Sequence, residues 1–374
     1  MSPAELAAAL LLVVCCLYYL VAMVAARRPP APRTATFLPP VSVLIPVRGL
    51  DRSFPECARS HARQKYPEFE ILFASSDPAD PVIPEIRRLA AEFPGRRIEA
   101  FHTEQDFGPN DKVNSLERLR AAARYEVLVV ADSDVELEPD ALSRTVAPLA
   151  DPAVGLVHCL YRGLPAPGLA SLLQALWIST DFQASVLVAR LLGIPFALGA
   201  AMAMRRQELD RIGGFAPLAA YLADDFWLAR RIAGLGKRIE LSSSVVATAL
   251  PEGNWRQVWR HRLRWGRTLR SCRRWGYAGV LVTFAVPLGI LALAVELRLW
   301  PLAAAAVTFR LVTGLVVGAG LLRDLQVGRW FGLLPLADLF SFAVWAASLF
   351  GRQVEWRGRR YRLGRSGAGG DLKA

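Results

Sequence analysis

Long apolar stretches at both ends of the 374-residue chain limit what it can fold into. Residues 5–26 are apolar apart from Glu5, and this run is long enough to cross a bilayer as a helix. It is too long for the core of a signal peptide, and no basic residue precedes it. We therefore interpret residues 1–30 as a retained transmembrane anchor.

Three more apolar stretches lie near the other end of the chain, at about 277–297, 301–322 and 331–350. The first and third contain a proline, while Arg310 and Asp338 place charges in the second and third. Membranes tolerate such breaks where neighbouring protein satisfies the polar groups. Residues 277–350 are therefore predicted to hold the C-terminal transmembrane segments.

Three arginines set the expected orientation. Arg27, Arg28 and Arg33 follow the anchor, so the positive-inside tendency places the N-terminus outside and the next segment in the cytosol. Four complete crossings would then leave the basic tail, residues 351–374, outside. Because its arginines favour the cytosolic face, we expect one late stretch to be re-entrant or interfacial.

The net charge of +12 raises the question of a nucleic-acid partner. The basic residues gather beside the apolar stretches, from Arg256 to Arg274 and from Arg352 to Arg365. Clusters in that position are typical of contacts with anionic lipid head groups, so the expected partner is a lipid bilayer and not nucleic acid. The five cysteines contain no C-x-x-C pair and fit reduced thiols better than a disulfide framework or a zinc site.

Between the membrane regions, residues 38–250 alternate short β-rich runs with helical periodicity. The candidate strands cover residues 41–47, 69–75, 97–103 and 125–132, and helical stretches lie near residues 84–93, 112–124 and 139–149. This alternation predicts an α/β domain with a mostly parallel sheet and helices on both faces. In such sheets the ligand lies beyond the carboxyl ends of the strands.

Charged residues stand where three of these strands end. Arg48 follows the first strand, Asp77 the second, and Asp132 and Asp134 the fourth. Two aspartates at i and i+2 can converge on one hard cation, and a divalent ion can bridge carboxylates to a diphosphate. The alternative is a turn former or a helix cap ahead of Pro139.

A second acidic pair, Asp224 and Asp225, precedes an amphipathic helix, for which helix capping is the alternative role. Upstream, the glycine pair at 213–214 indicates a loop that approaches a ligand closely. Downstream, residues 251–276 are rich in arginine and tryptophan and predict an interfacial amphipathic helix. Together these features indicate a phosphate-bearing donor and a lipid-borne acceptor.

Four motifs in order resemble the D, D-x-D, D, (Q)-x-x-R-W signature of membrane-bound family-2 glycosyltransferases. They are Asp77, the D-x-D at 132–134, the pair at 224–225 and HRLRW at 261–265. Within that family the chain is most similar to the ceramide glucosyltransferase group, which includes bacterial hopanoid-associated glycosyltransferases. Eight ordered segments carry the likeness over nearly the whole chain, from VSVLIPVRGLD near the start to VEWRGRRYRL in the tail.

Two positions depart from that pattern. His261 replaces the usual glutamine and leaves the Arg/Trp pair intact. Asp181 stands where the ceramide enzymes place a histidine near the acceptor. The acceptor therefore stays open between ceramide and a hopanoid polyol.

The resemblance implies a GT-A catalytic domain that uses a UDP-sugar together with Mg²⁺ or Mn²⁺. It assigns Asp134 as a metal ligand and Asp132 as a contact to the metal through its bound water, or to the ribose. Asp77 would accept hydrogen bonds from the uracil. Arg48 and Lys112 would offset the charge of the diphosphate.

The same resemblance assigns Asp225 as the general base, with its pKa raised by neighbouring Asp224 and by desolvation. Arg264 would clamp the diphosphate, and Trp265 would pack against sugar or acceptor. We expect residues 168–200 to lie at the membrane interface and to lead the lipid head to Asp225, with a core helix pair as the alternative.

We therefore predict an inverting glycosyltransferase that moves one hexose, glucose or N-acetylglucosamine, from a UDP-sugar to a hydroxyl of a ceramide-like membrane lipid. Its expected location is a bacterial inner membrane, with the catalytic domain in the cytosol. The alternatives are the same chemistry on a hopanoid polyol, a processive polysaccharide synthase and a non-catalytic membrane scaffold. The sequence leaves the sugar, the acceptor and the oligomeric state open.

Overall fold

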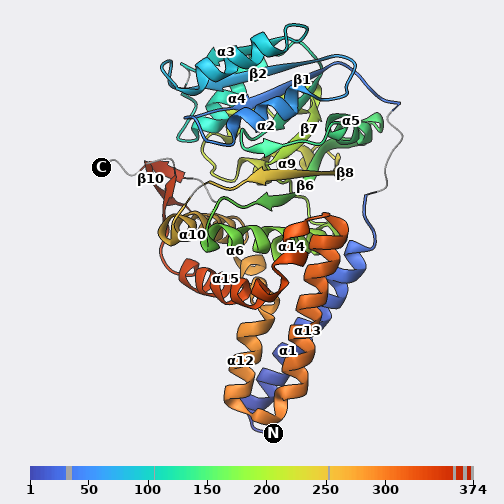
Figure 1. Ribbon diagram of the computed structural model, residues 1–374, viewed down its shortest axis with the longest axis vertical. Helices are drawn as coiled ribbons and strands as arrows, with labels where there is room; N and C mark the ends of the chain where they lie inside the picture. Colours follow the sequence, from blue (N-terminus) through green and yellow to red (C-terminus); the bar gives the residue numbers. More distant parts are fainter. Residues whose placement is uncertain (31–35, 105, 252, 357–358, 365–368, 372–374) are drawn as a thin grey trace.

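The computed structural model describes residues 1–374 except 31–35, 105, 252, 357–358, 365–368 and 372–374. Figure 1 shows an α/β domain above a slender helical stem, with the N-terminus at the foot of the stem. Several helices lie roughly flat between these two parts (Figure 1). Arg33, part of the predicted cytosolic flank, falls outside the described residues.

An eight-stranded mixed sheet, in the order β3-β2-β1-β4-β7-β6-β8-β5, forms the centre of the α/β domain as far as it is described. Strands β3, β2, β1 and β4 are parallel, as are β6 and β8, whereas β7 runs antiparallel to β4 and β6, and β5 to β8. The strands are β1 (Val41–Pro46), β2 (Phe69–Ser75), β3 (Ile98–His102), β4 (Val127–Ala131), β5 (Val135–Glu136), β6 (Val154–Leu164), β7 (Ala201–Arg205) and β8 (Arg238–Ala249). The four predicted strands are β1 to β4, and the predicted fold class is confirmed.

Helices cover both faces of the sheet because its central strands are apolar on both sides. In β1, Val43 and Ile45 pack with Phe54 and Ile86 on one face, whereas Leu44 packs on the other face, in the layer that holds Leu116 and Leu228. The covering helices are α2 (Phe54–Ala62), α3 (Val82–Glu92), α4 (Asp111–Ala122), α5 (Ala141–Val146), α8 (Arg206–Arg211) and α9 (Asp224–Gly234).

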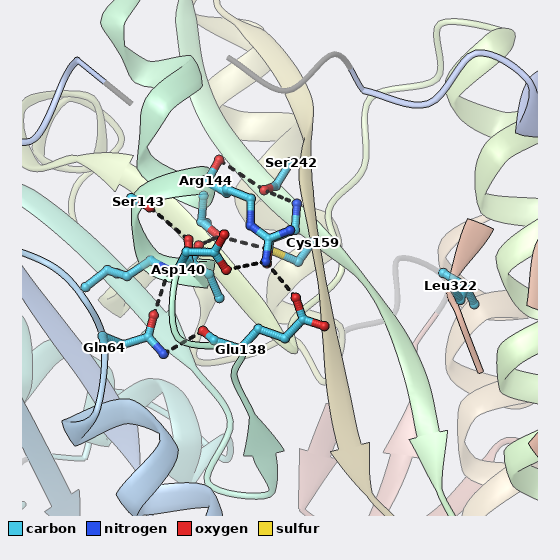
Figure 2. A network of polar contacts seen from close by, with 12 residues as sticks. Gln64, Glu138, Asp140, Ser143, Arg144, Cys159, Ser242 and Leu322 are labelled. Atoms are coloured by element: carbon cyan, nitrogen blue, oxygen red, sulfur yellow. Dashed lines mark hydrogen bonds and ion pairs between the residues drawn. The ribbon is translucent and has the colours of Figure 1, made fainter. Parts of the chain in front are cut away.

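A polar network fixes the chain that follows the D-x-D motif (Figure 2). Arg144 on α5 donates to Glu138 at 2.7 Å and to Asp140 at 2.5 Å. Gln64 donates to the Glu138 carbonyl at 2.8 Å and accepts from the Leu142 amide at 2.9 Å. Asp140 precedes α5 but makes no side-chain cap, so its carboxylate serves the ion pair instead.

The stem is a bundle of α1 (Pro3–Ala26), α12 (Ala285–Val295) and α13 (Trp300–Gly314) (Figure 1). Leu12, Cys15 and Tyr19 of α1 pack there against Ala285 and Ala303. Four helices of the described chain are long and apolar enough to cross a membrane: Pro3–Ala26, Leu169–Leu191, Leu297–Leu321 and Phe331–Ser348. A fifth candidate is the bent pair Arg274–Thr283 and Ala285–Val295.

The last apolar helix does not continue the stem. Instead α15 (Leu334–Ser348) lies across its upper end, against α10 (Trp255–Cys272) and α6 (Leu169–Trp177) (Figure 1). A π-helical turn, Ile178–Phe182, joins α6 to α7 (Gln183–Leu191). The segment 168–200 therefore begins with a helical run, Leu169–Leu191, between the sheet and the stem and continues as irregular chain.

The basic tail is folded where the structure describes it. It forms a three-stranded antiparallel sheet of β9 (Gln353–Trp356), β10 (Arg359–Leu363) and β11 (Gly369–Asp371). Val354, Tyr361 and Leu363 pack against Leu222, which lies two residues before the second acidic pair. The tail therefore lies on the α/β domain.

Candidate active site

A lysine and three aspartates meet at the carboxyl end of β4. Lys112 lies in the first turn of α4, and its Nζ is 2.7 Å from Asp132 Oδ1 and 3.7 Å from Asp224 Oδ2. The Lys112 and Asp224 side chains are only 11% and 10% exposed. Asp225 follows Asp224 at the start of α9. The fold thus gathers charged groups from distant parts of the sequence, and among them Asp132 belongs to the predicted strand-end set.

Backbone amides hold the Asp225 carboxylate. Its Oδ2 accepts from the Gly199 amide at 2.9 Å, and its Oδ1 accepts from the Phe226 amide at 2.7 Å. A Cβ at position 199 would lie 3.1 Å from this Oδ2 and 3.4 Å from Lys112 Nζ, so a glycine suits the close approach. No local pattern in the sequence indicates this contact, and the sequence analysis missed Gly199.

Burial and crowding of carboxylates raise several pKa values in the cluster. Burial, followed by the Asp224 charge, raises the pKa of Asp225 to about 7. Burial also raises the pKa of Asp224, although Lys112 opposes this shift. Burial alone would lower the pKa of Lys112, but the charges of Asp132 and Asp224 outweigh it and raise that pKa. Lys112 is therefore a fixed cation inside the cluster.

The D-x-D carboxylates fit a hard divalent cation. Burial and the nearby Asp132 charge raise the pKa of Asp134 to about 7, a repulsion that a bound cation would relieve. The described residues contain no group of three or more His, Cys, Asp or Glu side chains suited to a metal. Mg²⁺ commonly uses only one or two carboxylates when substrate phosphates and water complete its shell. Asp132 and Asp134 match that donor set.

Arg48 and Asp77 lie at the same sheet edge but outside the central cluster. Arg48 Nη1 is 2.5 Å from Asp111 Oδ2, next to Lys112 in the chain. Asp77 is exposed, and its Oδ1 accepts from the Ala79 amide at 2.9 Å as a turn former does. No contact between Asp77 and the cluster is seen among the described residues.

Asp80, three residues after Asp77, is the buried carboxylate of this turn. It is 2% exposed and accepts from the Gly49 amide at 2.9 Å and from the Ser75 hydroxyl at 2.7 Å. It therefore ties the loop after β1 to the end of β2. The motif SSDPADP offers both aspartates, and the sequence analysis missed this one.

Trp265 forms part of an aromatic floor made of the rings of Trp177, Phe182 and Tyr161. Its ring centroid lies 6.2 Å from Trp177 and 6.1 Å from Phe182, and Phe182 lies 5.7 Å from Tyr161. Burial, followed by the charges of Asp225 and the D-x-D carboxylates, raises the pKa of Tyr161. Tyr161 is a further residue that the sequence analysis missed.

His261 supports the aromatic floor from α10. Its Nδ1 is 2.9 Å from Gln174 Nε2, and its ring lies edge-on to Trp265 at 4.9 Å. Burial and the charge of Arg264 lower its pKa to about 3, so the ring is neutral at physiological pH. The histidine that replaces the usual glutamine therefore fixes Trp265 by packing.

Arg264 faces away from Trp265, toward the tail. Its guanidinium carbon lies 5.7 Å from the centre of the Trp356 ring. It also lines a cavity of about 180 Å³ between α10 and the tail sheet, together with Arg260, Arg267, Arg360 and Glu355. Such a concentration of guanidinium groups suits a phosphate-bearing ligand.

The glycine pair at 213–214 serves a different contact from the one predicted. Both residues have positive φ, 89° and 77°. A Cβ at Gly214 would lie 2.7 Å from Glu117 Oε2, which accepts from the Phe215 amide at 2.7 Å. Gly214 thus lets the chain pass close to the buried carboxylate of α4, and the approach of this loop to a ligand stays a prediction.

A family model described as glycosyl transferase family 21 matches residues 7–368. The chain belongs to this family. The match covers the α/β domain, the stem and most of the tail. Together with the relatives below, it confirms the predicted resemblance to the ceramide glucosyltransferase group.

Two curated relatives are similar to this chain in sequence. Ceramide glucosyltransferase 1 of Caenorhabditis elegans is 26% identical over 207 residues, which cover 55% of this chain and 44% of that protein. Ceramide glucosyltransferase of Candida albicans is 33% identical over 121 residues, which cover 29% of this chain and 22% of that protein. The chain thus spans less than half the length of these relatives.

A solved structure shares the fold over almost its whole length. It is the mannosyltransferase PcManGT from Pyrobaculum calidifontis in complex with GDP-Man and Mn²⁺, with a TM-score of 0.55 at 22% sequence identity. The likeness covers 93% of this chain and 99% of that one. It supports the GT-A type of the α/β domain.

Proposed function

We propose that this family 21 member transfers one hexose from a UDP-sugar to a hydroxyl of a ceramide-like membrane lipid, with inversion at the anomeric carbon. The observation that carries the proposal is the cluster of Lys112, Asp132, Asp224 and Asp225 at the carboxyl end of β4. The curated relatives named for ceramide glucosylation support the lipid acceptor.

In the proposed mechanism Asp225 is the general base. The Gly199 and Phe226 amides orient its carboxylate, and its raised pKa suits proton removal from an alcohol near neutral pH. The lipid hydroxyl then attacks the anomeric carbon from the face opposite the leaving nucleotide. Asp224, held by Lys112, keeps negative charge beside the base.

The donor side of the site is assigned to the strand ends. Asp134 and Asp132 would hold Mg²⁺ or Mn²⁺, which as a Lewis acid stabilises the departing nucleoside diphosphate. PcManGT was solved with Mn²⁺ and a nucleotide sugar, which supports a divalent ion here. Arg48 and Lys112 offset the charge of the donor phosphates, and Asp77 contacts the uracil of the donor. Arg264 contacts the diphosphate, and Trp265 supports the acceptor.

The helix arrangement supports a specific membrane topology. The tail packs on the α/β domain, so both lie on one side and the chain between them crosses an even number of times. We assign those two crossings to α12 and α13 and place α15 flat in the interface (Figure 1). A third crossing, α1, precedes the α/β domain in the chain. Arg27 and Arg28 then put the α/β domain in the cytosol, and the inner membrane of a bacterium is the proposed location.

This topology predicts the side of the membrane on which each of two introduced cysteines reacts. In a cysteine-free variant, a cysteine at Leu297, in the turn between α12 and α13, should react with a membrane-impermeant maleimide in intact cells. A cysteine at Gly364 in the tail should react only after permeabilisation. Labelling of Gly364 from outside would contradict the assignment of α15.

Removal of the metal ligand should weaken donor binding. Asp134→Ala is expected to raise the Kd for UDP-sugar at least tenfold in the presence of Mn²⁺ and to abolish the metal dependence of binding, because one of two carboxylate ligands is lost. Calorimetry with and without Mn²⁺ measures both. The control Asp210→Ala, at a half-exposed carboxylate paired with Arg120, should leave the Kd unchanged. Unchanged metal-dependent binding by Asp134→Ala would refute the role.

The pH dependence should reveal the base. An aspartate acts as a base only when ionised, and the Asp225 pKa is raised to about 7, so kcat/KM should rise through pH 7 and level off above it. The pH profile of kcat/KM reports the free enzyme and is measured with purified protein in detergent. An acid limb near pH 4 would show an unperturbed carboxylate and contradict this prediction.

A mass-spectrometric screen tests the function as a whole. Purified protein is incubated with UDP-glucose, UDP-N-acetylglucosamine or GDP-mannose and with ceramide, a hopanoid polyol or extracted lipids. A product with one added hexose on ceramide supports the proposal. A hopanoid product corrects the acceptor, a ladder of sugars indicates a processive synthase, and no product with any donor supports a scaffold.

A further inference from the structure

A buried tyrosine of the folded tail contacts the segments that lead into the catalytic cluster. Tyr361 of β10 is 2% exposed, and its hydroxyl donates to the Pro109 carbonyl at 3.2 Å. Its ring packs with Val354 and Leu363 against Leu222. Pro109 and Leu222 each lie a few residues before a charged group of the cluster, Lys112 in one loop and Asp224 in the other.

Asn110 joins those two loops. Its backbone N–H donates to the Ala219 carbonyl at 3.0 Å, and its side-chain Nδ2 donates to the Tyr221 carbonyl at 2.7 Å. Its side-chain oxygen caps α4 by accepting from the Lys112 amide at 3.1 Å. A displacement of Pro109 or Leu222 would therefore move both Lys112 and the acidic pair.

The same sheet is attached to α10 on its other side. Arg267 donates to the Gln353 carbonyl at 2.6 Å, and Arg264 lies over Trp356. The tail thus joins the helix that carries Trp265 to the loops that carry the carboxylates. A flexible basic tail would supply charge to the membrane surface but no such bridge.

We propose that Tyr361 is a positioning residue that holds the Lys112 loop and the Asp224–Asp225 loop in their catalytic arrangement. The inference rests on the proposed glycosyl transfer, because position matters to turnover only if these groups act on a substrate. Small errors in the placement of reacting groups lower the rate strongly while ground-state binding changes little. The tail is then part of the active site, although none of its residues reacts.

The test uses the full-length protein and a matched pair of variants. Tyr361→Phe removes only the hydroxyl. The control is Tyr66→Phe, since Tyr66 is 5% exposed and also donates to a prolyl carbonyl, that of Pro39 at 2.7 Å, at the opposite edge of the sheet. Both variants lose a hydrogen bond from a buried tyrosine to a prolyl carbonyl, so a merely structural effect should be similar in the two.

For Tyr361→Phe we expect kcat to fall about tenfold with the donor KM within about twofold, and amide hydrogen exchange to quicken in residues 106–112 and 218–226. Tyr66→Phe should keep kcat within about twofold. Wild-type kcat in Tyr361→Phe, or equal losses in both variants, would overturn the inference. Absence of transfer by the wild type would instead refute the proposed function, and unchanged exchange in both loops would then still overturn the positioning role.

Discussion

Asp225→Asn should lower the rate of sugar transfer by about 10²- to 10⁴-fold while UDP-sugar binding persists. The amide keeps the size of the side chain but cannot take a proton from the attacking hydroxyl, and loss of a general base costs about that factor. In the proposed mechanism, donor binding depends on other groups, chiefly Asp134 and the arginines. Single-turnover kinetics and calorimetry on the same preparation separate the two effects.

The Asp225→Asn experiment needs a control for local disturbance, because Gly199 and Phe226 both direct N–H groups at this carboxylate. An asparagine satisfies one of them and opposes the other, so Asp225→Ala should be made as well; both variants should lose transfer. Asp210 on α8 is half exposed and pairs with Arg120. The variant Asp210→Asn should turn over like the wild type. Turnover of Asp225→Asn above about a tenth of the wild-type rate would contradict the base assignment.

The parallel half of the domain could be predicted because its signals are local. Strands β1, β2 and β4 are short apolar runs buried on both faces, which no other element of that length explains as well. Parallel strands present their carboxyl ends at one edge, and of the residues that follow them Asp132 joins the central cluster, whereas Asp77 makes no contact with it among the described residues. Lys112 was named by the family resemblance and not by the strand pattern.

The other half gave no such signal. Strand β8 contains RIELSSSVVATA, in which Ser242 and Ser244 are buried among apolar neighbours, so its pattern resembles a polar loop. The contacts that matter most at the site join residues far apart in sequence, such as Gly199 with Asp225 and Pro109 with Tyr361. Neither contact follows a period or a motif, and only the packed fold brings the partners together.

Two charges that interrupt separate apolar stretches in the sequence form a pair in the structure. Arg310 Nε on α13 is 2.8 Å from Asp338 Oδ1 on α15, and the two side chains are 1% and 2% exposed. Arg310 also donates to the Thr180 hydroxyl at 3.1 Å in the π-helical turn. The pair therefore connects α13 of the stem, α15 and the π-helical turn between α6 and α7.

Arg310→Met should destabilise the protein by about 3–5 kcal/mol, because it leaves the Asp338 carboxylate buried without its partner. Asp338→Leu should cost a similar amount, and the double variant should recover most of the loss since no buried charge remains. Unfolding of the detergent-solubilised variants measures the cycle, with Arg298→Met in the α12–α13 turn as a neutral control. If the two single losses simply added in the double variant, the charges would not act as a pair, and the assignment of α15 to a fixed position across the stem would lose its main support.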